Sequence, residues 1–368
     1  MGAIAPPLRR LRNQPESATH PSEGSLRVLL AKDESDSQRW DAFVDSHPES
    51  NHSHRWGWKR IMETIMGWPT CYLIATQAEE VHGIVPLVWQ KSWLFGSFVS
   101  SMPFLNAGGI LARCPEAERA LLEGAVEFTK GVGAEYLELR HRCDHGLDIP
   151  LRTNKLTLIR EVQADEEQMF AALDKKVRSD VRKSMKSGFA AQFGGQPLLD
   201  EFYRVFAVNM RNLGTPVYSR VFFQEILRTF PNDTHVCVVR QEGRAAAASF
   251  LIGNRDTVEA VWSASLSQYR ALKPNMFLYW SLLCYAAQKG YRYFDFGRSS
   301  VGSGTHRFKL QWAPKEVPLH WAYWLAQGSE LPALNPENPK YRLAIWLWQR
   351  LPLSLTKWIG PKIVRCLP

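Results

Sequence analysis

Ionisable side chains and small, flexible residues are interleaved in residues 294–312, which read FDFGRSSVGSGTHRFKLQW. Asp295, Arg298 and Lys309 are the groups in this stretch that could act directly on a substrate. Transfer of an acyl or aminoacyl group from an ester to an amine needs a positioned amine, a group that stabilises the oxyanion, and cations that hold a phosphate-bearing carrier. Because this transfer needs no nucleophile on the protein, these three residues are our candidates for the catalytic groups.

Arg298 is expected at the end of a strand, beside Asp295. The carboxylate either orients the guanidinium or forms a purely structural ion pair with it. A carboxylate paired with arginine has a lowered pKa, so Asp295 is a weaker candidate for a general base. Residues 299–304 either present backbone N–H groups to an anion or form a plain connecting loop.

The formal net charge of +9 comes from two short segments. Residues 175–188 hold six Lys or Arg and one Asp, and residues 341–368 hold five Lys or Arg and no acid. In the first segment Arg178 and Arg182 are four residues apart, so they would share one face of a helix. Together with Lys183 they either bind phosphates or form a solvated basic face.

The C-terminal segment also contains Trp346, Trp348 and Trp358. Aromatic and cationic residues in this mixture are typical of a segment that lies at a membrane interface, although a helix packed on the preceding domain would have a similar composition. We favour peripheral contact of residues 341–368 with the inner membrane.

Other features exclude several classes of protein. The six cysteines are isolated, which favours a reducing compartment. No signal segment and no uncharged apolar run of about 18 residues occurs, so we expect a cytoplasmic protein. Residues 1–24 are predicted to be disordered. His141, Cys143 and His145 alternate after a strand, but no further ligand cluster accompanies them, and we therefore expect no metal.

The order of predicted elements occurs twice. A helix that starts at a proline and ends at a glycine is expected between Pro115 and Gly131 and again between Pro274 and Gly290. A strand that ends in Arg140 or Arg298 follows each helix, and two apolar strands (70–88 and 234–252) precede it. A further helix is expected after Ser53 and after Ser219.

This order predicts an α/β (α+β) protein with two tandem GNAT-like acyltransferase domains, each a mixed, largely antiparallel sheet flanked by helices. We place the domains at residues 25–160 and 161–328, followed by a basic aromatic segment at 329–368. A CoA-dependent GNAT enzyme binds the pyrophosphate in a glycine-rich turn before a helix. The corresponding residues here, 111–118 and 267–275, contain no glycine, which disfavours CoA in both domains.

Three segments resemble the FemA/FemB family of tandem GNAT-like proteins, which attach amino acids from aminoacyl-tRNA to peptidoglycan precursors. Residues 175–189 resemble the basic helix of the family, residues 199–214 the helix that carries a precursor-binding arginine, and residues 294–312 the terminal signature. The DFGRS, GSGTHRFK and KPN elements resemble the branch associated with the exosortase and PEP-CTERM sorting system.

The resemblance implies roles for individual residues. Lys309 matches a family lysine near the transferred carbonyl or the tRNA end, which implies electrostatic stabilisation, unless it is an ordinary surface lysine. Arg211 matches the precursor-binding arginine, unless it is a helix-surface arginine. Lys59 lies where the family has a precursor-binding lysine, whereas core packing is the better interpretation for the neighbouring Trp56. The predicted substrate-binding residues are Arg211, Tyr218, Arg307, Arg178, Arg182, Lys183 and Lys59.

We therefore predict a FemAB-like transferase that moves an aminoacyl or acyl group onto a peptidoglycan or exopolysaccharide precursor, free or lipid-linked. No bound cofactor is expected, and the donor is either aminoacyl-tRNA or acyl-CoA. Two alternatives stay open: a CoA-dependent N-acyltransferase, and a non-enzymatic basic module that binds RNA or anionic lipid.

Overall fold

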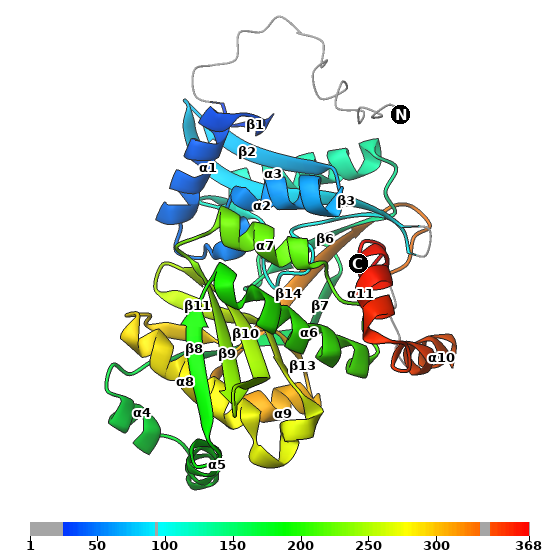
Figure 1. Cartoon of the computed structure of the whole chain (residues 1–368). Coiled ribbons are helices and arrows are strands. Elements are labelled where there is room, and N and C mark those ends of the chain that lie inside the picture. Colours follow the sequence, from blue (N-terminus) through cyan, green and yellow to red (C-terminus); the bar gives the residue numbers. More distant parts are fainter. Residues whose placement is uncertain (1–24, 93–94, 332–338, 368) are drawn as a thin grey trace, which may run out of the picture. The chain divides into compact units, whose positions relative to one another are not determined.

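The computed structural model describes residues 25–92, 95–331 and 339–367 (Figure 1). This part of the chain divides into two compact units. Unit 1 comprises residues 25–153 and 319–331, and unit 2 comprises residues 154–318 and 339–367. Residues 154–160, which the sequence analysis assigns to the first domain, thus lie in unit 2, and residues 319–328 lie in unit 1. The segment 1–24, predicted to be disordered, lies outside the described residues.

Unit 1 is built on a mixed sheet with the strand order β1, β2, β3, β4, β6, β14. The pair β4 and β6 is parallel, and the other pairs are antiparallel. The bounds are Arg27–Leu30 (β1), Thr70–Gln77 (β2), Glu80–Ser92 (β3), Gly96–Ser100 (β4), Tyr136–His141 (β6) and Lys315–Leu325 (β14), with the short β5 (Leu111–Ala112) paired to β3. β14 belongs to unit 1 from Leu319 onward.

Two helices pack on this sheet. α3 (Pro115–Gly131) begins with the predicted proline in its first turn, and its buried stripe of Ala117, Leu121 and Ala125 packs on β2 and β3. α1 (Glu34–Ser46) is capped by Asp33 and places Trp40 against the ring of Tyr72 in β2.

The helix expected directly after Ser53 starts later than predicted. Ser53 lies in a 3-10 turn, η2 (His52–His54), because Asn51 caps this turn by accepting a hydrogen bond from the Ser53 N–H. The helix proper is α2 (Gly57–Arg60), which continues as a π-helix, η3 (Ile61–Met66).

Unit 2 repeats the arrangement with the strand order β7, β12, β11, β10, β9, β8, and β13 also pairs with β7. β11 and β12 are parallel, and the other neighbours are antiparallel. The bounds are Leu151–Glu161 (β7), Phe189–Gly194 (β8), Thr234–Gln241 (β9), Arg244–Asn254 (β10), Thr257–Ser265 (β11), Tyr293–Asp295 (β12) and Ser299–Ser300 (β13). The mixed, largely antiparallel GNAT-like fold predicted from the sequence is thereby confirmed.

The helices of unit 2 lie on both faces of its sheet. α8 (Pro274–Gln288) covers one face together with the basic helix α5 (Lys175–Met185), and α6 (Leu199–Leu213) and α7 (Arg220–Thr229) cover the other. Ser219 caps α7 as expected. The remaining elements are α4 (Glu166–Ala171), η4 (Gln196–Leu198), η5 (Ser267–Leu272), α9 (Gly304–Leu310), α10 (Pro339–Trp348) and α11 (Leu353–Val364).

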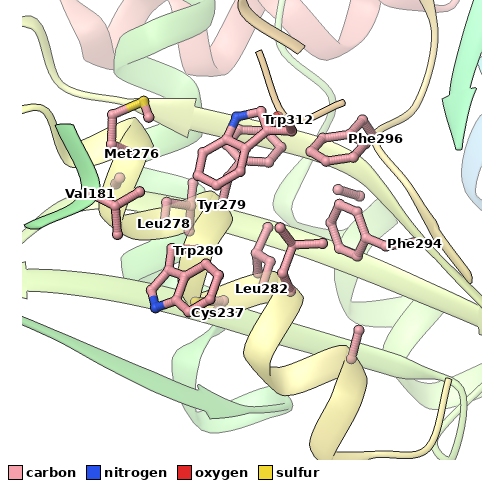
Figure 2. Close-up of a cluster of buried hydrophobic side chains, with 14 of the residues drawn as sticks. Val181, Cys237, Met276, Leu278, Tyr279, Trp280, Leu282, Phe294, Phe296 and Trp312 are labelled. Atoms are coloured by element: carbon pink, nitrogen blue, oxygen red, sulfur yellow. The ribbon is translucent and has the colours of Figure 1, made fainter. Parts of the chain in front are cut away.

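The core between α8 and the sheet is rich in aromatic side chains. Figure 2 shows Tyr279 and Leu282 of α8 with Phe294 and Phe296 and the indole of Trp312, all of them buried. Phe296 lies edge to face with Phe294 at a centroid distance of 4.8 Å and is stacked near Tyr279 at 5.6 Å. Burial of such large side chains anchors the start of β12 and the end of α9 to the same core.

Two predictions for residues 293–304 need correction. The closing strand β12 ends at Asp295 and not at Arg298, because Gly297 takes a left-handed conformation (φ +73°) that turns the chain away. Residues 299–304 are not a plain loop, because Ser299 and Ser300 pair with β7, and the Ser303 hydroxyl caps α9 by accepting a hydrogen bond from the His306 N–H.

Candidate active site

The two parallel strands of unit 2 separate after a short pairing. Three residues of β11, from Thr257 to Glu259, pair with β12, which then ends at Asp295 while β11 continues to Ser265. Among the described residues, no strand pairs with positions 260–265 of β11 on that side. Backbone N–H and C=O groups at such an open strand edge are available to a bound substrate.

A cavity of about 750 Å³ lies beside this part of β11. Tyr279 and Phe308 form an aromatic wall, with ring centroids 5.4 Å apart in an edge-to-face arrangement. The Tyr279 hydroxyl hydrogen-bonds to Ser263, and burial raises the pKa of this phenol. The uncharged polar residues that line the cavity are Asn209, Ser263, Ser265, Ser267, Asn275, Thr305 and Gln311. An apolar wall with several polar groups is typical of a small-molecule site.

Cations lie where the cavity meets the start of α8. The turn before this helix forms η5, and Lys273 follows with a left-handed backbone (φ +59°) and caps α8 without a side-chain acceptor. Arg270 and Lys273 both line the cavity, Arg270 is exposed, and Lys273 forms an ion pair with Asp180. These cations favour an anion at this end of the cavity.

Lys309 of α9 is buried rather than exposed. Only 4% of its surface is accessible, and its ammonium donates hydrogen bonds to the carbonyl oxygens of Gly297 (2.9 Å) and Arg298 (3.0 Å). Burial lowers the pKa of Lys309 to about 8, while the nearby Asp295 and Glu259 oppose that shift. The alternative of an ordinary surface lysine is therefore wrong, and near neutral pH the group is a buried cation.

Two buried carboxylates lie next to each other near this lysine. Asp295 and Glu259 are partners in the β11–β12 register, and both are almost inaccessible. Asp295 accepts hydrogen bonds from the Thr157 hydroxyl and from the Gly297 N–H, at 2.8 Å in the latter case. The structure thus brings Asp295, Lys309 and the Arg298 charge together around Gly297.

Comparisons with known proteins agree with this geometry. The family model "Acetyltransferase (GNAT) domain" matches residues 171–310. The lipid II:glycine glycyltransferase of Staphylococcus haemolyticus is 21% identical over 216 residues, which cover 53% of this chain and 51% of that protein. The crystal structure of FemX superposes with a TM-score of 0.62 at 14% identity, over 87% of this chain and 100% of that one.

The chain is thus similar to FemAB-type tandem GNAT proteins, and part of unit 2 matches the GNAT domain model. The fold is shared more widely, since a tandem GNAT protein from the clavulanic acid biosynthesis pathway superposes with a TM-score of 0.52 at 13% identity, over 83% of this chain and 100% of that one. This chain spans about half the length of the curated relatives that it matches. Its assignment to the exosortase and PEP-CTERM branch stays a prediction.

None of the seven predicted substrate-binding residues lines this cavity. Arg211 lies on α6 between the cavity-lining Asn209 and Leu213 but is not itself a lining residue, and its guanidinium donates to the Asn212 side chain (2.9 Å). Tyr218 is stacked near Phe222 at 5.1 Å, inside an aromatic cluster. Arg307 is exposed on α9 and donates to the Gly302 carbonyl (2.7 Å).

Arg178 and Arg182 do share one face of α5, as their spacing predicts. Both line a second cavity of about 520 Å³, together with Phe170, Trp280 and two glutamates of α4. Arg182 lies over the Phe170 ring at 5.1 Å, whereas Arg178 donates to backbone carbonyls of Ala171 and Leu173. Lys183 is exposed and does not line this cavity.

In unit 1, Lys59 forms an ion pair with Glu63 (2.5 Å) and lies 5.9 Å from the centroid of the Trp56 ring. Trp56 is half-buried against Trp40 and Tyr72, so packing accounts for it.

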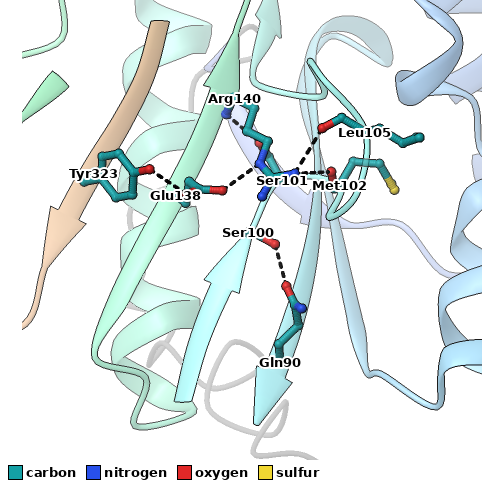
Figure 3. A network of polar contacts seen from close by, with 8 residues as sticks. All are labelled: Gln90, Ser100, Ser101, Met102, Leu105, Glu138, Arg140 and Tyr323. Atoms are coloured by element: carbon teal, nitrogen blue, oxygen red, sulfur yellow. Dashed lines mark hydrogen bonds and ion pairs between the residues drawn. The ribbon is translucent and has the colours of Figure 1, made fainter. Parts of the chain in front are cut away.

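A buried polar network on β6 of unit 1 was not predicted. Figure 3 shows the Arg140 guanidinium donating to Glu138 (2.6 Å) and to the Leu105 carbonyl (3.0 Å), while the Tyr323 hydroxyl donates to Glu138 (2.6 Å). Arg140 also stacks on the Trp321 ring at 4.4 Å. An ion pair with Glu138, hydrogen bonds to backbone carbonyls and a stacked indole make a structural role the simplest interpretation. The alternating strand pattern ELR contained the pair, but nothing in it indicated burial of both charges.

Proposed function

We propose that this chain is an aminoacyl or acyl transferase that acts on a cell-envelope precursor. The observation that carries the proposal is the cavity at the β11–β12 separation, with cations at its helix end and the buried Lys309 on the α9 helix that forms one of its walls. The match to the GNAT domain model and the name of the glycyltransferase relative support the same reaction class.

In the proposed reaction the acceptor amine attacks the carbonyl carbon of the donor ester. The carbonyl oxygen becomes an oxyanion, and the ester oxygen then leaves as an alcohol with the proton that the amine loses. Protonated Lys309 stabilises the developing negative charge, since its charge is held by protein groups rather than by water. Asp295 and Glu259 keep the lysine protonated near neutral pH by their charge.

For the donor we propose aminoacyl-tRNA, with acyl-CoA as the second candidate. The turn before α8 lacks the glycines with which CoA-dependent enzymes approach the pyrophosphate, and it presents Arg270 and Lys273 instead. Flexible cationic side chains accommodate a polynucleotide end as well as a pyrophosphate. Arg178, Arg182 and Lys183 of α5 add positive charge on the same unit and are proposed to contact the backbone of the carrier.

For the acceptor we propose a peptidoglycan or exopolysaccharide precursor, free or linked to a lipid. The name of the glycyltransferase relative contains lipid II, a lipid-linked precursor. None of the described helices is long and apolar enough to cross a bilayer. We propose that α10 and α11 contact the inner membrane peripherally, where a lipid-linked acceptor would be found.

The proposal is tested by a donor screen with purified protein. Labelled aminoacyl-tRNAs, acetyl-CoA and longer acyl-CoAs are supplied, and transfer of label into crude envelope precursor is followed. We expect label from aminoacyl-tRNA, and a loss of at least about 100-fold in Lys309→Ala, the scale of losing one oxyanion-stabilising group. Lys315→Ala removes an exposed lysine and is the matched control.

Two other outcomes would replace the proposal. Label that moves only from an acyl-CoA would make the chain a CoA-dependent N-acyltransferase. No transfer from any donor, together with RNA or vesicle binding that is lost when Arg178, Arg182 and Lys183 are neutralised, would make it a non-enzymatic binding module.

A further inference from the structure

We propose that Glu49, Cys143 and His145 in unit 1 bind a divalent metal ion of the zinc type. The three side chains offer a carboxylate oxygen, a sulfur and a ring nitrogen that all lie within 4.8 Å of one another. The sequence placed Cys143 and His145 together but gave no sign of Glu49, which the fold brings from 94 residues away to a contact of 3.6 Å with the Cys143 sulfur. The proposal is independent of the transferase site in unit 2.

The ligand types and the available space fit such an ion. Thiolate, imidazole and carboxylate are the ligands that zinc takes in proteins, at about 2.0 to 2.3 Å from the metal. Ligand atoms of a tetrahedral ion are then about 3.3 to 3.8 Å apart, so the trio must draw in by roughly 1 Å. Glu49 can supply this movement because it is exposed and follows the end of α1. A cavity of about 20 Å³ that these residues line, together with Arg140, Arg142 and others, has room for one ion or water.

A neighbouring carboxylate orients the histidine as a metal site requires. His145 Nδ1 hydrogen-bonds to the Glu118 carboxylate from α3, so the other ring nitrogen, Nε2, keeps its lone pair for a metal. Asp144 holds the turn that carries Cys143 and His145, since its carboxylate accepts a hydrogen bond from the Gly146 N–H (2.9 Å). Glu118 acts on the metal through His145, which makes it a positioning residue.

The nearby His141 is not a ligand in this arrangement. Its ring stacks on His145 at a centroid distance of 4.1 Å, but its Nε2 accepts a hydrogen bond from the Ile110 N–H (3.1 Å). Within the described residues, no fourth His, Cys, Asp or Glu joins the trio. The fourth position is therefore left to water or to a substrate atom, which is the coordination of an open rather than a closed zinc site.

Metal binding at this site balances both protons and charge. The Cys143 thiol loses its proton to solvent as the sulfur–metal bond forms, and the thiolate and the Glu49 carboxylate together neutralise the two charges of the ion. Oxidation and reduction play no part, because zinc does not change its oxidation state.

Cobalt substitution tests the site by its spectrum rather than by activity. The full chain is stripped with chelator and titrated with Co²⁺, and a thiolate-to-cobalt charge-transfer band is followed in the near ultraviolet while Zn²⁺ is added in competition. We expect one equivalent of Co²⁺ with this band, displaced by Zn²⁺, and loss of the band in Cys143→Ser and His145→Ala. Cys114→Ser, another half-buried cysteine of unit 1, is the control and should keep the band.

Glu118→Gln tests the positioning role. The variant should keep the band but bind Co²⁺ about 10- to 100-fold more weakly, as removal of a hydrogen-bond partner of a ligating histidine does. Far-ultraviolet circular dichroism of the metal-free variants shows whether each is folded. Absence of the band in the folded wild-type chain, or a band that persists in folded Cys143→Ser, would overturn the proposal.

Discussion

Lys309 holds its charge at a position where burial makes that charge costly. Its pKa is lowered from 10.5 to about 8, so between these pH values the unfolded chain binds a proton that the folded chain does not. The free energy of unfolding should therefore rise as the pH increases from about 8 to 10.5, by about 3 kcal/mol from this group. Urea unfolding of the wild type and of Lys309→Met at pH 7.5 and 10 measures the difference. A rise of equal size in both proteins would show that Lys309 is not its source.

The contributions of Glu138 and Arg140 in unit 1 to the free energy of unfolding should be strongly coupled. Both are buried, and the arginine also satisfies backbone carbonyls. Arg140→Met leaves the Glu138 carboxylate buried with Tyr323 as its described hydrogen-bond donor, so we expect a loss of about 3 to 5 kcal/mol in the free energy of unfolding. In the Arg140→Met/Glu138→Gln double variant part of this loss should be recovered. Denaturant unfolding of the wild type, of Arg140→Met, of Glu138→Gln and of the double variant gives the coupling free energy between the two residues. If the losses of the two single variants add up to that of the double variant, the two charges are not coupled.

At the scale of elements, the turn between β12 and β13 fixes both the strand separation and Lys309. Gly297 has φ +73°, and a Cβ there would lie 2.9 Å from the Ala260 carbonyl oxygen of β11. Gly297→Ala should therefore lower the free energy of unfolding by about 2 to 4 kcal/mol and disturb the lysine. Gly302→Ala is the matched control, since φ is +75° but no atom lies within 4 Å, and it should cost about 1 kcal/mol. Thermal unfolding compares them, and equal losses would mean that only the backbone angle matters.

The same region shows what a sequence can and cannot predict. Pro274 and the following apolar residues predicted α8 correctly, because capping and periodicity are local signals. The end of β12 at Asp295 and the burial of Lys309 depend on contacts with Thr157, Glu259 and the Gly297 carbonyl, which no local pattern contains. The family motif made Lys309 a candidate, whereas its burial and its contacts are visible only in the folded chain.

Long-range pairing also explains why the unit boundaries differ from those drawn on the sequence. β7 directly follows the elements of unit 1 in the chain, yet it pairs with β12 of unit 2. β14 follows the elements of unit 2 and pairs with β6 of unit 1. Unit 2 thus begins with β7, and unit 1 completes its sheet with β14 from further along the chain. Two consecutive domains drawn on the sequence do not contain this arrangement, because strand composition does not specify a partner.

At the scale of the whole molecule, the C-terminal helices carry the side chains for which we propose contact with the membrane. Thr356, Gly360 and Val364 are buried along one face of α11, and Gly360 lies against Val217 of the same unit. Trp358 is 65% exposed with Lys362 over its ring, and in α10 Trp346 is 48% exposed with Arg350 at 3.7 Å from its ring centroid. Trp348, by contrast, is buried and belongs to the packing. Exposed aromatic rings with basic side chains over them therefore remain, an arrangement that suits an anionic bilayer surface.

In a density-gradient flotation assay, the full chain should float with vesicles that contain anionic phospholipid. With vesicles of neutral phosphatidylcholine it should stay in the bottom fraction. Trp346→Ala/Trp358→Ala should lower the partition coefficient by at least about 10-fold, because insertion of both rings supplies the apolar part of binding. High salt should weaken binding of the wild type by screening Arg350, Lys357 and Lys362. Leu29→Ala, which removes an exposed apolar residue of unit 1, controls for general surface hydrophobicity. If the double variant floats as well as the wild type, the proposed membrane contact through α10 and α11 is wrong.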